Sequence, residues 1–159
     1  MMNASALTPR VVGTAENAHR ALLEHLLAGT DLTYQRWVAL TLVAASDRVL
    51  ESGVLARLIA ALKLNGEEGH AVVADLAALC LVTSSDGYLR LTDRGRHLYT
   101  RIRAAVAEAI ETAYAGIPAD DLAIAGRVLT EITARLNATL DELGSRQSIA
   151  AVRLSRLQV

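Results

Sequence analysis

Apolar and polar residues alternate on both sides of Asp86-Gly87, and this pattern predicts a β-hairpin. The two turn residues tolerate the positive φ angles that a type I′ turn requires. The expected strands are Leu81 to Ser84 and Tyr88 to Leu91.

Elsewhere, apolar residues recur at three- and four-residue steps, which is the period of amphipathic helices. Potential caps and breakers delimit six helices. Four precede the hairpin: one from Thr14 or Asn17 toward Gly29, one from near Thr33, one over Gly53 to Leu62, and one from Glu67 to about Leu79. Two follow it: one from Thr92 to near Gly116 and one from Pro118 to Gly144.

The third and fourth predicted helices are joined by a short turn, Lys63 to Gly66, and the hairpin follows them directly. This order is that of a winged helix-turn-helix. The predicted fold class is therefore mainly α with a small two-stranded β-wing, namely a winged helix-turn-helix plus long dimerisation helices.

The sixth predicted helix carries a seam with coiled-coil spacing, which needs another helix to cover it. The seam consists of Leu122, Ala125, Leu129, Ile132, Leu136, Thr139 and Leu143. We expect a second copy of the chain to cover much of it, giving a homodimer. An intrachain bundle is the alternative.

The expected organisation has three parts. Residues 1–14 form a flexible N-terminal arm, residues 15–144 a single domain, and residues 145–159 a basic C-terminal tail. Within the domain, the winged helix covers about 32–95, and the dimerisation helices cover about 15–29 and 96–144.

Composition narrows the class of protein further. Hydrophobic residues make up 52% of the chain and aromatic residues only 3%, which suits close helix packing. A single cysteine excludes an internal disulfide, and neither a signal peptide nor a membrane span is indicated, so we expect a cytoplasmic protein. The net charge of −1 gives no overall attraction to nucleic acid.

Several short segments, in this order and spacing, resemble the MarR family of regulators. They are Leu32 to Trp37, Leu55 to Leu58, Leu76, Leu81-Val82, Leu91-Thr92 with Gly95, and Ile117-Pro118, and together they cover most of residues 15–143. The resemblance implies a homodimeric winged-helix repressor. It also implies that the fourth helix enters the DNA major groove, that the wing touches the minor groove, and that a small ligand, often an aromatic acid, binds near the dimerisation helices.

The expected DNA-reading segment departs from the family pattern. Residues 52–91 contain three cationic side chains but four carboxylates, whereas DNA affinity comes largely from cations on phosphates. Glu67 and Glu68 stand where the family has hydroxyl residues, Ala71 where it often has an arginine, and Cys80 where it tends to have a glycine. The wing is also short. The candidate DNA contacts are Arg57, Asn65, Glu67, Glu68, His70, Ser84, Ser85, Arg90, Arg94 and Arg96.

A ligand site is expected where the family geometry brings aromatic side chains and cations together. A rigid aromatic surface beside a cation suits a planar anion. The candidates are His25, Tyr34, Arg36, Trp37, Tyr99 and Arg101, each of which has a core or surface role as its alternative.

No other chemistry has a sequence signature. The four histidines lack the spacing of metal ligands on one helix face, no phosphate loop or nucleophile motif is present, and no cofactor is indicated. Cys80 is expected to act as a small hydrophobic residue.

The first hypothesis is a ligand-responsive, homodimeric DNA-binding regulator. The alternatives are a scaffold that has lost DNA binding and binds or transforms a small molecule, and a module that pairs with a DNA-binding relative.

Overall fold

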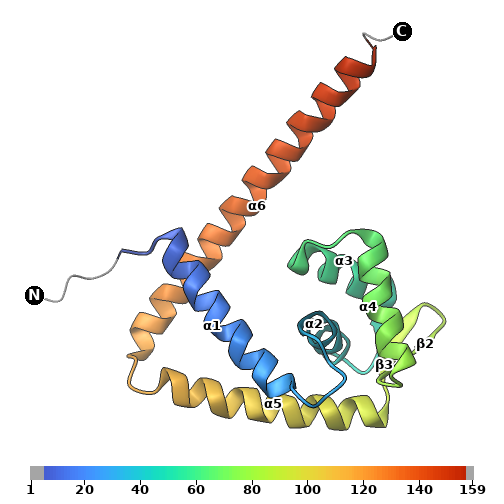
Figure 1. Cartoon of the computed structure of the whole chain (residues 1–159), viewed down its shortest axis with the longest axis vertical. Coiled ribbons are helices and arrows are strands. Elements are labelled where there is room, and N and C mark those ends of the chain that lie inside the picture. The colour runs from blue at the N-terminus through green and yellow to red at the C-terminus, as the bar shows by residue number, and fades with distance from the viewer. Residues whose placement is uncertain (1–5, 157–159) are drawn as a thin grey trace, which may run out of the picture. The chain divides into compact units, whose positions relative to one another are not determined.

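The computed structural model describes residues 6–156, with side chains up to residue 146. Its elements are α1 (Pro9–Leu27), α2 (Tyr34–Val43), β1 (Val49–Leu50), α3 (Glu51–Leu62), α4 (Gly66–Ala78), β2 (Val82–Ser85), β3 (Tyr88–Leu91), α5 (Asp93–Tyr114) and α6 (Ala119–Arg156) (Figure 1). They fall into two compact units, residues 1–113 and 114–159. The grouping of residues 15–144 as a single domain stays a prediction.

The core of the first unit is built around α2, which packs against α1, α3, α4 and β3. Leu40 of α2, Leu58 of α3, Leu76 of α4 and Leu89 of β3 are completely buried. Aliphatic side chains and Trp37 fill this core, which contains no Phe, as the composition indicates. The mainly helical winged helix-turn-helix class is therefore confirmed.

The wing is a three-stranded antiparallel sheet in the order β1-β3-β2. The predicted hairpin is confirmed, with φ angles of 54° at Asp86 and 75° at Gly87. The sequence did not indicate β1, because a two-residue strand is too short to show alternation.

The first residue of α3 is attached to the wing. Leu50 at the N-cap makes no side-chain hydrogen bond, and the Glu51 N–H donates instead to the Gly87 carbonyl at 3.0 Å. The Ser84 hydroxyl also donates to a Glu51 carboxylate oxygen at 2.8 Å. The start of α3 and the hairpin turn are thus held together.

Capping explains most helix boundaries. Thr33 caps α2 as expected, and Thr92 precedes α5 and accepts a bond from the Gly95 N–H at 2.9 Å. The expected start of the first helix at Thr14 or Asn17 is wrong, because Thr8 caps a helix that begins at Pro9, where proline's fixed φ is favourable.

The expected end of the sixth helix at Gly144 is also wrong, since α6 continues to Arg156. Most of the segment expected as a separate tail is thus helical. Glycine weakens a helix interior without necessarily ending it. Within residues 6–156, no helix is long and apolar enough to cross a membrane.

Gly95 marks the tightest approach in the fold. A Cβ on this buried residue would overlap the backbone carbonyl oxygen of Leu81. Thr92 closes the same junction, with its N–H donating to that oxygen at 3.1 Å and its hydroxyl donating to the Cys80 carbonyl at 2.7 Å. Only glycine lets α5 start this close to β2.

Gly95→Ala should therefore lower the free energy of unfolding by about 3 kcal/mol, because backbone must move to admit the methyl group. Chemical denaturation measures this. Gly13→Ala is the matched control, since no atom lies within 4 Å of a Cβ there and alanine favours the α1 helix by roughly 0.5–1 kcal/mol. Equal stability of Gly95→Ala and the wild-type chain would contradict the proposed contact.

Candidate functional site

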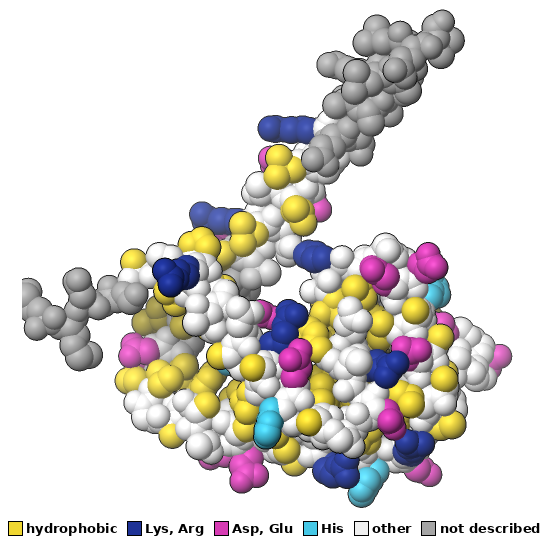
Figure 2. Space-filling view, viewed as in Figure 1, with side chains coloured by type: hydrophobic (Ala, Val, Ile, Leu, Met, Phe, Trp, Pro, Cys, Tyr) yellow, Lys and Arg dark blue, Asp and Glu magenta, His cyan; other side chains and the backbone are white. Residues whose placement is uncertain are grey.

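The outward face of α4, the second helix of the helix-turn-helix, carries few groups that can read bases. Its exposed residues include Glu67, His70, Ala71 and Ala74, while Val72 and Leu76 face the core. Figure 2 shows acidic side chains at the α3–α4 end of this unit. Beyond one carboxylate and one imidazole, the middle of this face offers only methyl groups.

The polar residues at the start of α4 cap the N-terminus of this helix. The Asn65 side chain accepts from the Glu68 N–H at 2.9 Å, and the Glu68 carboxylate accepts from the Asn65 N–H at 2.8 Å. This is a capping box. His70 Nδ1 lies 2.7 Å from the Gly66 carbonyl, which can only accept, so Nδ1 carries a proton and Nε2 is the remaining ring nitrogen.

The end of α4 keeps the turn that a glycine would make. Cys80 adopts a φ of 55°, and the Leu81 N–H donates back to the Leu76 carbonyl at 2.9 Å. The Cys80 side chain is exposed. A non-glycine residue thus adopts the left-handed conformation that commonly ends a helix.

Arg36, expected in the ligand site, instead joins α2 to α4. Its Nε and Nη2 donate to Asp75 Oδ2 at 3.1 and 2.7 Å, and its Nη1 donates to the Asp31 carbonyl at 2.9 Å. Asp75 is therefore neutralised by a partner, which leaves the surface of α4 less acidic than its sequence suggests.

The expected wing contacts lie on two faces of the sheet. Ser84 turns toward Glu51, and the Ser85 hydroxyl donates to Asp86 Oδ2 at 3.0 Å. Arg90 is exposed and pairs in register with Thr83. The wing candidates thus divide between two surfaces.

Arg48 also contributes to this wing surface, although no pattern in the sequence points to it. Its guanidinium carbon lies 3.6 Å from the ring centroid of Tyr88. A hollow of about 220 Å³ is lined by Arg48, Thr83, Ser85, Asp86, Tyr88 and Arg90. Arg48 could be placed beside the hairpin only by recognising β1, which follows it directly. A two-residue strand is too short to be recognised from the sequence.

The arginines of α5 and α3 lie in separate surroundings. Arg94 is 3.5 Å from Asp31, and both line a polar hollow of about 420 Å³ together with His97 and Arg101. Arg96 lines a different hollow beside residues 44–47. Arg57 is exposed on α3. Arg101 is thus grouped with Arg94, and it does not line the pocket beside Trp37.

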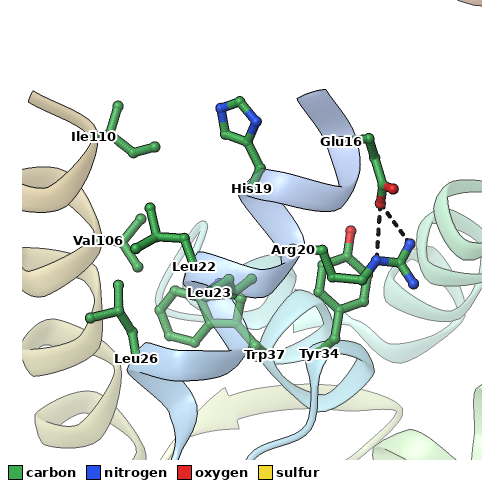
Figure 3. Close-up of a pocket in the computed structure, with 10 residues that line it drawn as sticks. All are labelled: Glu16, His19, Arg20, Leu22, Leu23, Leu26, Tyr34, Trp37, Val106 and Ile110. Atoms are coloured by element: carbon green, nitrogen blue, oxygen red, sulfur yellow. Dashed lines mark hydrogen bonds and ion pairs between the residues drawn. The ribbon is translucent and has the colours of Figure 1, made fainter. Parts of the chain in front are cut away.

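An apolar pocket of about 260 Å³ opens between α1, α2 and α5 (Figure 3). Tyr34 and Trp37 line it as expected, and Tyr99 stacks on Trp37 with ring centroids 5.6 Å apart. The remaining walls are Glu16, His19, Arg20, Leu22, Leu23, Leu26, Val106 and Ile110. His25 is exposed and does not line this pocket; the α1 histidine that does is His19.

Arg20 supplies the cation at this pocket that was expected from Arg36 or Arg101. Its guanidinium lies 4.8 Å from the Tyr34 ring centroid and donates to Glu16 Oε1 at 3.0 and 2.6 Å. Its hydrogen bond to the Glu16 carboxylate raises the pKa of Arg20, which stays protonated. The helical spacing of Glu16, His19, Arg20 and Leu23 was the sequence signal for this wall.

No protein-family model matches the chain, and no curated protein matches its sequence. Solved structures do match its fold. A MarR family transcriptional regulator from Rhodococcus sp. RHA1 aligns with a TM-score of 0.65 and 21% identity, covering 81% of this chain and 96% of that one.

Two further solved structures contain a bound partner. The Mycobacterium tuberculosis MarR family protein Rv2887, in complex with DNA, aligns with a TM-score of 0.61 and 21% identity, covering 80% of this chain and 98% of that one. NadR in complex with 4-hydroxyphenylacetate aligns with a TM-score of 0.66 and 18% identity, covering 80% of this chain and 96% of that one.

The elements and these alignments define a winged helix-turn-helix protein with additional long helices. Its fold is that of the MarR family of transcriptional regulators.

Proposed function

We propose that this protein is a DNA-binding transcriptional regulator that responds to a small aromatic anion. The observation that carries this proposal is the double role of α2. Tyr34 and Trp37 line the apolar pocket, while Arg36 of the same helix holds Asp75 of α4 at 2.7 Å. A ligand that shifts α2 would therefore bias the position of α4.

Similar proteins support both halves of the proposal. A structure with this fold was solved with DNA and another with 4-hydroxyphenylacetate. We assign α4 to the major groove, which admits a helix. The ligand acts by population shift, favouring a conformation in which α4 no longer fits the groove.

The pocket chemistry suggests the ligand class. Leucine and valine side chains with Trp37 accommodate a ring, and Arg20 at the edge can donate hydrogen bonds to a carboxylate. Because Arg20 already binds Glu16, the ligand must compete with that carboxylate. The expected ligand is thus a compact aromatic acid.

A homodimer is part of the proposal. The seam residues Leu129, Leu136 and Leu143 of α6 are 38%, 64% and 50% exposed. Figure 2 shows hydrophobic side chains at the surface of this helix. We propose that a second copy covers them, because exposed apolar side chains at this spacing favour helix pairing.

One observation favours a second candidate function. The outward face of α4 combines Glu67 with alanine methyl groups, and neither attracts phosphate. A scaffold that has lost DNA binding and uses only its pocket is the alternative.

Fluorescence anisotropy with the DNA upstream of its own gene tests the main proposal. The chain should bind this DNA more tightly than a scrambled duplex, with an affinity that falls steeply as salt rises. Glu67→Gln should strengthen binding roughly twofold to tenfold, because it removes an exposed negative charge from α4. Glu108→Gln, on an exposed position of α5, should change little. Absence of binding at low salt would favour the scaffold alternative.

Trp37, the only tryptophan, should report ligand binding through its fluorescence. Titration with 4-hydroxyphenylacetate should give a saturable change in emission. Arg20→Gln should weaken binding roughly tenfold through loss of a charge-assisted hydrogen bond, while Glu16→Gln should strengthen it by freeing Arg20. Arg103→Gln, outside the pocket, is the control. Identical affinities for all four proteins would refute the assigned role of Arg20.

Sedimentation velocity tests the dimer. Leu136→Glu should convert a dimer into a monomer, because it places a charge in the apolar seam. Ala138→Glu adds the same charge to an exposed position on the opposite side of the helix and should leave the dimer intact. A monomeric wild-type chain at micromolar concentration would contradict the proposal.

A further inference from the structure

We infer that the outer face of the wing sheet binds the phosphate backbone of DNA, with Arg48 and Arg90 making the contacts. This inference rests on the proposed DNA-binding function. It assigns a contact to Arg48, and it places the wing contact on the face of the sheet instead of the hairpin tip.

Strand register brings the two arginines together. Val49 pairs with Leu89, and Thr83 pairs with Arg90. Arg48 immediately precedes Val49, so continuing this register places it beside Arg90, and both arginines line the same hollow. Residues directly opposite each other project from the same face of an antiparallel sheet. Leu89, one residue along, is buried on the other face. Strands β2 and β3 and the residue before β1 thus bring Thr83, Arg90 and Arg48 to one face of the sheet.

Arg48 is oriented for binding before any ligand arrives. Its guanidinium is 3.6 Å from the Tyr88 ring centroid, a distance that indicates stacking. The face of the guanidinium is occupied by the ring, which leaves its N–H groups at the edge to donate to an anion. Within the described part of the chain, neither Arg48 nor Arg90 forms an ion pair with a carboxylate.

The surroundings suit a phosphate group. The hollow of about 220 Å³ also presents the hydroxyls of Thr83 and Ser85, which are additional donors. Asp86 is its one acidic lining residue, and it accepts the Ser85 hydroxyl at 3.0 Å. Two arginines against one carboxylate make this surface cationic, in contrast to the acidic start of α4.

The short turn explains why the face, and not the tip, makes the contact. Asp86 and Gly87 alone join the strands, and neither provides a long cationic side chain for insertion into the minor groove. Phosphate contacts set position and affinity without reading sequence. The outer face therefore supplies the attraction that α4 lacks.

The test uses the full chain in anisotropy titrations over a salt series, with upstream DNA and a scrambled duplex of equal length. Arg48→Gln and Arg90→Gln should each lower the slope of log affinity against log salt by about 0.9. Each should weaken binding on the order of tenfold near 0.1 M salt, by the same factor for both duplexes. Arg127→Gln, exposed on α6, removes the same charge and should leave the slope unchanged.

Tyr88 is a positioning residue, and two variants test its role. Tyr88→Phe keeps the ring and should bind DNA as the wild type does. Tyr88→Leu loses the stacking surface and should weaken binding, with the fold verified by circular dichroism. Equal binding by the two variants would show that the stack contributes nothing.

The outcomes separate this inference from the proposed function. If the wild type binds DNA and both arginine variants keep its salt slope, the outer face is not a contact, although the protein remains a DNA-binding regulator. Loss of affinity confined to A·T-rich DNA with an unchanged slope would indicate minor-groove insertion and overturn the phosphate assignment. If the wild type binds no DNA at low salt, both proposals fail.

Discussion

The close approach of α5 to the start of β2 determines how the helix-turn-helix connects to the rest of its unit. Gly95 permits it because any side chain would overlap the Leu81 carbonyl oxygen. Thr92 adds hydrogen bonds to Cys80 and Leu81 at the same point. The end of α4, the start of the wing and the start of α5 therefore meet at one backbone junction, and α5 continues from it to the pocket wall at Val106.

Helix α2 contacts both the apolar pocket and α4, through different side chains at neighbouring positions. Tyr34 and Trp37 contribute aromatic rings to the pocket, whereas Arg36 contributes a charge to α4. A helix places adjacent residues about 100° apart, so one short element can contact two sites at once. A displacement of α2 at the pocket would therefore also act on its ion pair with α4.

Local signals predicted most of the elements. Asp86-Gly87 identified the hairpin, Thr33 and Thr92 identified helix starts, and the three-to-four spacing identified the long helices. The predictions of the start of α1 and the end of α6 were wrong, and β1 was not predicted, because the local signals there are weak or the pairing partner is distant in the sequence. Pro9 opened α1 early, Gly144 did not end α6, and β1 exists only because Val49 and Leu50 pair with a strand almost forty residues away.

The candidate site was predictable only in part for the same reason. Tyr34 and Trp37 line the pocket, but the partner of a charged side chain cannot be deduced from its position in the sequence. Arg36 lies between the two aromatic residues along the chain and yet binds Asp75, 39 positions away. Arg20 takes the place at the pocket because its helix presents Glu16, Arg20 and Leu23 on one side.

The attachment of α3 to the wing turn limits how this sequence can evolve. The Glu51 N–H donates to the Gly87 carbonyl, and the aliphatic side chain of Leu50 offers no acceptor in its place. Inserting residues into the hairpin would move the acceptor away and leave the first turn of α3 without a cap. Wing length and the start of the helix-turn-helix are therefore inherited together, so a longer wing would require a compensating cap residue at position 50.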